Sequence, residues 1–160
     1  MDFFILSLTI LPSFIILLFF VKSDKFPEPA SAIIKVFIWG VLISIPIFFI
    51  NTYILFKISE KFLAVFPSAF VEEGFKLLVF YFVVLKLKDF DEPIDALVYG
   101  VIVSLGFATL ENIYYVYFSQ FSEIYGSTSL ASIRAITSIP AHASFGCLMG
   151  YFLLKPHFTT

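Results

Sequence analysis

Cysteine and charge are both scarce in this sequence of 160 residues. The single cysteine, Cys147, lies in an apolar run, which excludes an intrachain disulfide and a zinc site built from several cysteines. Charged residues make up 14% of the chain, whereas soluble domains contain about 25%. The formal net charge is −2 and no basic block occurs, so we expect no nucleic-acid partner. The HExxH pattern of many zinc proteases is also absent.

Hydrophobic residues make up 60% of the chain. Apolar runs longer than about 18 residues recur, and this is the length of a helix that crosses a bilayer. The runs are continuously apolar and do not alternate as the strands of a membrane barrel do. The sequence therefore predicts an all-α membrane protein, a bundle of about five transmembrane helices with the active site inside the bundle. We expect one polytopic domain over residues 1–160, with spans at about 3–21, 32–56, 62–85, 94–118 and 131–154.

The connecting segments and the prolines predict where these spans begin, end or bend. Residues 119–130 are rich in Ser, Thr and Gly and form the longest expected loop. Pro46 and Pro67 lie inside spans and are expected to kink or break them. No Lys or Arg precedes the first run, so we expect a retained span and not a cleaved signal peptide.

The distribution of Lys and Arg favours an N-terminus outside and a C-terminus in the cytoplasm. The cytoplasmic side would receive Lys22, Lys25, Lys86, Lys88 and Lys155, and the outer side Lys57, Lys61 and Arg134. We expect Arg134 to reach the membrane interface, as long basic side chains at span ends commonly do.

Two adjacent glutamates, Glu72 and Glu73, interrupt the third span. A charged side chain at bilayer depth costs about 3 kcal/mol on insertion scales, so such residues are rare and usually functional. The fourth span contains Glu111 and the fifth contains His142. Counting about 1.5 Å per residue from the span ends places all of these sites at a similar depth. The sequence therefore predicts that three neighbouring helices bring the carboxylates and the imidazole together.

These residue types are suited to the activation of a water molecule. Glu72, assisted by Glu73 or Glu111, could take a proton from water as a general base. His142 could stabilise an oxyanion or bind a metal. Glu72, Glu111 and His142 are also candidate ligands for a divalent metal such as zinc.

Two further residues are expected to support this set. Lys76 lies three and four residues after the glutamate pair on the expected helix, and it can neutralise one of the two carboxylates. Asn112 could donate to a substrate carbonyl or bridge to a neighbouring backbone.

The order of three motifs resembles the PrsW family of intramembrane proteases, within the superfamily of CAAX prenyl-type and abortive-infection membrane proteases. The motifs are EExxK at 72–76, DALVYGVIVSLGFATLEN at 95–112 and PAHASFG at 140–146. The resemblance implies a helical protease in the cell membrane of a prokaryote that cuts membrane-associated proteins, as in site-1 cleavage of anti-sigma factors. It places Glu72, Glu73, Lys76, Glu111 and His142 at the family's motif positions. It leaves open whether the glutamate-activated water is held by a metal.

Two other functions fit intramembrane carboxylates. One is a proton- or cation-coupled transporter, in which carboxylates relay ions, although five spans without an internal repeat are a poor basis for alternating access. The other is a non-catalytic membrane binding module of the same fold. The expected partners of the protease are the lipid bilayer and a membrane-anchored protein substrate.

Overall fold

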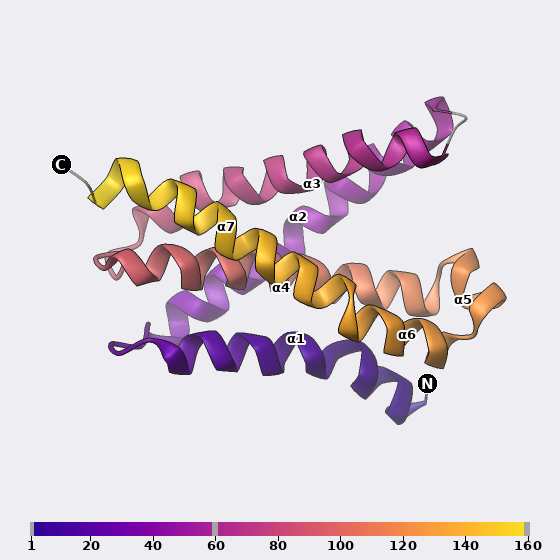
Figure 1. The fold of residues 1–160 in the computed structure, drawn as a ribbon, viewed down its shortest axis with the longest axis horizontal. Coiled ribbons are helices and arrows are strands. Elements are labelled where there is room, and N and C mark those ends of the chain that lie inside the picture. Colours follow the sequence, from indigo (N-terminus) through magenta and orange to yellow (C-terminus); the bar gives the residue numbers. More distant parts are fainter. Residues whose placement is uncertain (1, 59–60, 159–160) are drawn as a thin grey trace.

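The computed structural model describes residues 2–58 and 61–158, and these residues form helices without a strand. The prediction of an all-α fold is confirmed. Figure 1 shows the helices as an elongated bundle. In chain order they are α1 (Phe3–Ser23), α2 (Ala30–Lys57), α3 (Lys61–Phe82), the short 3₁₀ helix η1 (Val84–Lys86), α4 (Pro93–Tyr117), α5 (Gln120–Tyr125), α6 (Ser127–Ile136) and α7 (Ser138–Phe158).

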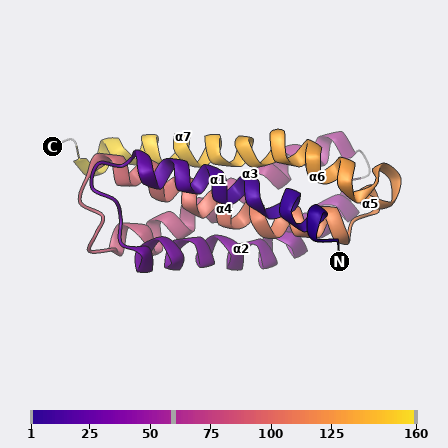
Figure 2. The same ribbon diagram turned by 90° about the horizontal axis from the view of Figure 1, so that it is seen from below.

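Helix α4 forms the centre of the bundle. It packs against α1, α2, α3, α6 and α7, and Figure 2 shows it between α2 and α7. In its most apolar 18-residue window, 78% of the residues are buried, compared with 17% for α1 and 28% for α2. The outer helices therefore turn most of their apolar side chains outward, as expected of a bundle whose surroundings are lipid.

Small residues allow α4 to approach its neighbours closely. A Cβ atom added to Gly100 would overlap the backbone carbonyl of Gly146 in α7, and one added to Gly150 would overlap that of Ala96. Helices in membranes commonly associate through such small residues. These contacts fix α7, and with it His142, against the central helix.

Among the described residues, α1, α2 and α4 are long and apolar enough to cross a membrane. Helices α3 and α7 have 22 and 21 residues, which also reaches the length of about 20 that a span needs. Helix α3 contains Glu72, Glu73 and Lys76 in its middle, so its apolar character is interrupted where the candidate site lies.

Three predicted boundaries were wrong. The fifth span is divided at Thr137 into α6 and α7, because Pro140 has no amide hydrogen to continue the helical bonding to Ile136. The expected loop at 119–130 is largely helical, as α5 and the start of α6. Helix α3 ends at Phe82, before the predicted Leu85, and the 3₁₀ turn follows it.

The two prolines expected to disturb their spans do not end them. Helix α2 continues through Pro46, and α3 continues through Pro67. Both prolines therefore lie inside unbroken helical segments.

Candidate active site

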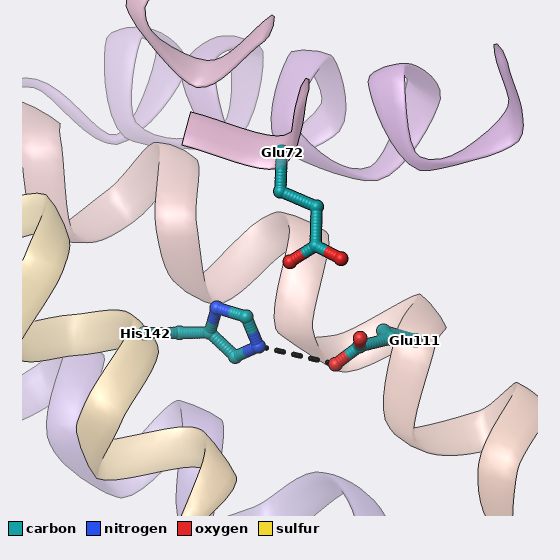
Figure 3. Close-up of side chains that lie close together, drawn as sticks. All are labelled: Glu72, Glu111 and His142. Atoms are coloured by element: carbon teal, nitrogen blue, oxygen red, sulfur yellow. Dashed lines mark hydrogen bonds and ion pairs between the residues drawn. The ribbon is translucent and has the colours of Figure 1, made fainter. Parts of the chain in front are cut away.

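Side chains from α3, α4 and α7 meet inside the bundle. Glu72, Glu111 and His142 each offer one ligand atom, and these atoms lie within 4.8 Å of one another. Figure 3 shows the Glu72 carboxylate directed toward the space between the imidazole and the Glu111 carboxylate. Each residue comes from a different helix, so their meeting depends on the packing of α3 and α7 around α4.

Glu111 is held by two donors on the same oxygen. The Nη2 atom of Arg134 lies 2.5 Å from Glu111 Oε2, and Nε2 of His142 lies 3.1 Å from that oxygen. The guanidinium also donates through Nε to Asn112 Oδ1 at 2.7 Å and stacks over the Tyr115 ring at 4.1 Å. The side chain of Arg134 is 13% exposed. The prediction that this arginine reaches the membrane interface was therefore wrong.

Arg134 lies in the shorter of the two helices into which the predicted fifth span is divided. This helix, α6, packs against α1 and α4. The break between α6 and α7 lies at Thr137. The signal for this break in the sequence is Pro140, three residues further on.

Lys76 is fully buried and contacts two of the predicted site residues. Its Nζ atom lies 2.7 Å from Glu73 Oε1 and 3.1 Å from Nδ1 of His142, and it also lies 4.5 Å above the Phe107 ring. An ammonium group has donors and no acceptor, so Nδ1 of the imidazole accepts this bond. The neutral ring then carries its proton on Nε2 and donates it to Glu111.

The three site carboxylates differ in their partners. Glu73 pairs with Lys76, and Glu111 pairs with Arg134. Glu72 accepts a hydrogen bond from the neutral amide of Asn51 in α2 at 3.0 Å. Among the described residues, no Lys or Arg forms an ion pair with Glu72. The sequence analysis did not identify Asn51 as a site residue. The feature of the sequence that points to it is a polar amide side chain inside an apolar span.

Asn112 is buried beside Arg134 and is not among the residues that line the cleft described below. It is 1% exposed, its Oδ1 accepts from Arg134, and its Nδ2 donates to the carbonyl of Thr9 at 3.4 Å. Of the two predicted roles, this placement matches a bridge to a neighbouring backbone.

A cleft of about 380 Å³ opens between α3 and α7 beside these residues. Its polar lining includes Glu72, Glu73 and His142. Its apolar lining includes Phe66, Phe70 and Phe145, which are 66%, 82% and 53% exposed. An extended peptide lying in this cleft would contact aromatic side chains while its backbone passes the polar group.

The donor set of Glu72, Glu111 and His142 fits a divalent metal in number and spacing. Catalytic zinc sites use three protein ligands of carboxylate and imidazole type and keep a fourth position open. A metal bound through His142 Nε2 would replace the present hydrogen bond from that atom to Glu111. Glu72 has no ion-pair partner in the described part of the chain to give up, so it is the ligand most readily available.

Comparison with known proteins adds independent evidence. Residues 28–159 match a family model described as PrsW family intramembrane metalloprotease. The Protease PrsW of Oceanobacillus iheyensis is 40% identical over 154 residues, which cover 94% of this chain and 68% of the relative. Those of Geobacillus kaustophilus and Bacillus subtilis are each 36% identical over 98% of this chain, covering 68% and 71% of the relatives. No solved structure matches the chain. The matches confirm the resemblance of the motifs and favour a protease over a transporter.

Proposed function

The chain belongs to the PrsW family of intramembrane metalloproteases, and we propose that it hydrolyses peptide bonds of membrane-anchored proteins in the cleft between α3 and α7. The observation that carries the proposal is the meeting of Glu72, Glu111 and His142 within 4.8 Å, beside a cleft that is otherwise largely apolar. Carboxylates and a histidine inside a membrane protein mark functional sites. The Glu and His set also supplies the groups that peptide hydrolysis needs.

Glu72 is the proposed general base. A carboxylate in an ion pair gives up that interaction when it accepts a proton, and this applies to Glu73 and Glu111. Glu72 is bound by the neutral Asn51 amide and is the carboxylate best able to take a proton from water. The same residue can then return the proton to the departing amine.

His142 is the proposed oxyanion donor. Lys76 on the Nδ1 side leaves the proton on Nε2, the atom that faces Glu111. As the scissile carbonyl becomes tetrahedral, the Nε2 proton can be donated to the new oxyanion. A donor placed in advance is worth about 10²- to 10³-fold in rate in other acyl-transfer enzymes.

Arg134 and Asn112 are proposed to position Glu111. The guanidinium holds both side chains, at 2.5 Å and 2.7 Å. Glu111 in turn accepts from His142 and so fixes the ring that would serve the oxyanion. These residues act through others and need not contact the substrate.

The metal implied by the family would be held by Glu72, Glu111 and His142. When bound, such an ion polarises the scissile carbonyl and makes a bound water more acidic. The cationic Lys76 and Arg134 lie on the outer sides of this set, where they orient His142 and Glu111. A metal on His142 Nε2 would take the place of the Nε2 proton, so metal binding and the oxyanion role of this histidine are alternatives. With a metal bound, the ring proton would lie on Nδ1, and Lys76 would have to accept it as a neutral amine.

The proposed substrate is a membrane-anchored protein, for which an anti-sigma factor is the type that the motifs suggest. The exposed Phe66, Phe70 and Phe145 at the cleft favour apolar side chains on either side of the scissile bond. We propose the predicted orientation, with the N-terminus outside.

Cleavage of a membrane-anchored reporter by the purified protein in liposomes tests this function. We expect the wild type and Glu123→Gln, which changes an exposed carboxylate in α5, to cut the reporter at similar rates. Glu72→Ala and His142→Ala should lose most of the activity while remaining folded. Equal cleavage by all four proteins would rule the assignment out.

A further inference from the structure

A second group of acidic side chains lies away from the candidate active site. Asp24 and Glu28 belong to the connection between α1 and α2, and Asp95 lies in the first turn of α4. One carboxylate oxygen from each residue lies within 4.8 Å of those from the other two. The three residues are 6%, 8% and 1% exposed, respectively. Nothing in the proposed proteolytic mechanism uses this cluster.

The cluster has no basic partner in the part of the chain that the structure describes. None of the three carboxylates forms an ion pair there. Lys22 and Lys25 flank Asp24 in the sequence, but both are exposed. Buried charges in proteins are normally paired or coordinate a metal, because burial removes their hydration. Three such groups together also repel one another.

Neutral groups already satisfy part of the cluster. The amides of Asp91 and Glu92 donate to Asp95 Oδ2 at 2.9 and 2.7 Å, as a helix cap. The Tyr99 hydroxyl donates to Glu28 Oε2 at 2.6 Å. These bonds orient the carboxylates but contribute no positive charge.

One oxygen of the cluster has no hydrogen-bond partner within residues 2–58 and 61–158. Asp24 Oδ1 accepts from the Phe26 amide at 3.0 Å. Oδ2 of the same carboxylate is buried and makes no hydrogen bond to any residue that the structure describes. Because a buried carboxylate oxygen needs a partner, this atom indicates that a ligand completes the cluster.

We propose that Asp24, Glu28 and Asp95 bind a hard divalent cation of the Ca²⁺ type, which fastens the α1–α2 connection to the start of α4. The donors are all oxygens, the ligand type that Ca²⁺ and Mg²⁺ prefer over softer metals. One carboxylate oxygen of each residue would be a ligand, and water would complete the coordination. Ca²⁺ accepts irregular geometry, whereas Mg²⁺ demands a near-ideal octahedron.

The surroundings of Glu28 are in keeping with a site that lacks positive charge. Burial raises the pKa of this carboxyl to about 7, and the neighbouring Asp95 adds to the effect against the opposing hydrogen bond from Tyr99. A cation bound to the cluster would offset both the burial and the repulsion.

Thermal unfolding of the detergent-solubilised protein, stripped of metal with EDTA, tests the site. Saturating Ca²⁺ should raise the Tm of the wild type by about 5 °C or more, and calorimetric titration should show Ca²⁺ binding that depends on the cluster. Asp24→Asn and Glu28→Gln should each abolish the Tm response. Glu72→Gln, which changes the other acidic site, should keep it.

Two results would overturn the proposal. An unchanged Ca²⁺ response in Asp24→Asn and Glu28→Gln would place the binding elsewhere. The absence of both heat and Tm shift in the wild type would mean that the cluster holds a shared proton and no cation. The wild-type titration decides the second point even if neither variant folds.

Discussion

The ammonium of Lys76 in α3 lies 3.1 Å from Nδ1 of His142 in α7, although the two residues are 66 positions apart in the sequence. Since the ammonium can only donate, this contact determines which ring nitrogen carries the proton. It therefore connects the EExxK motif directly to the histidine of the third motif. Lys76 does more than neutralise the glutamate beside it.

Replacing Lys76 with Met should remove this control of the imidazole. We expect kcat for reporter cleavage to fall by about 10²-fold with little change in KM, because the proton would no longer be held on Nε2. The chain contains two histidines, so ¹⁵N-histidine spectra can follow the ring directly. They should show the Nε2-protonated tautomer in the wild type and its loss in the variant. Lys86→Met, at an exposed lysine, is the control.

Arg134→Gln should reduce both activity and stability. Removing one member of a buried ion pair typically costs about 3–5 kcal/mol when the partner charge stays behind, and the partial exposure of this pair favours the lower end. The double variant Glu111→Gln/Arg134→Gln should recover part of the free energy of unfolding and none of the activity. Denaturation and cleavage assays measure the two effects. Similar stability of the single and double variants would contradict the pairing.

Gly100→Ala should destabilise the bundle, because the new Cβ would overlap the Gly146 backbone and force α4 and α7 apart. Overpacking of this kind costs about 1–3 kcal/mol. Gly74→Ala is the matched control, since an added Cβ there meets no described atom within 4 Å. Alanine at that position should be neutral or stabilising by up to about 1 kcal/mol. Unfolding in mixed detergent compares the two.

Ala69→Trp should obstruct the cleft without disturbing the fold. Ala69 lines the cleft and is exposed, so a larger side chain can be accommodated in the free protein. We expect KM for the reporter to rise by about 10-fold or more, with Tm unchanged. Val65→Trp replaces a residue of the same helix that is 59% exposed and does not line the cleft, and it should leave cleavage intact. If both substitutions inhibited cleavage equally, the result would contradict a role of the cleft in substrate binding.

The meeting of Glu72, Glu111 and His142 follows from the sequence because helical rise converts position into depth. Residues at equal depth on neighbouring antiparallel helices become neighbours when each lies on the side of its helix that faces the other helix. Gly146 and Gly150 lie four residues apart, a spacing that favours close packing of helices in membranes, and both contact the α4 backbone closely. Local composition and helix geometry were sufficient for these features.

The positions of Arg134 and Asn51 could not be predicted from helix length and residue spacing. The inward position of Arg134 depends on its contact with Glu111 and on the packing of α6 against α1 and α4, whereas the apolar pattern indicated one continuous span. Asn51 has no charged neighbour in sequence, and its contact with Glu72 depends on how α2 and α3 pack. Tertiary packing decides both, and hydrophobic periodicity does not contain that information.

The orientation in the membrane is also affected by Arg134. Its ion pair with Glu111 removes it from the charges that face the outer side. The orientation with the N-terminus outside stays a prediction, with Lys57 and Lys61 as the remaining basic residues on the outer side.

A comparison of Glu72→Gln with Glu73→Gln in single-turnover cleavage of the liposome-bound reporter tests the central claim most directly. The two residues are adjacent on one helix and both line the cleft, but Glu73 alone is paired with Lys76. If Glu72 is the base, its replacement should slow cleavage by about 10²- to 10⁴-fold, and replacement of Glu73 by less than about 10-fold. A larger loss in Glu73→Gln, or equal losses in both, would contradict the assignment of the unpaired glutamate as the base.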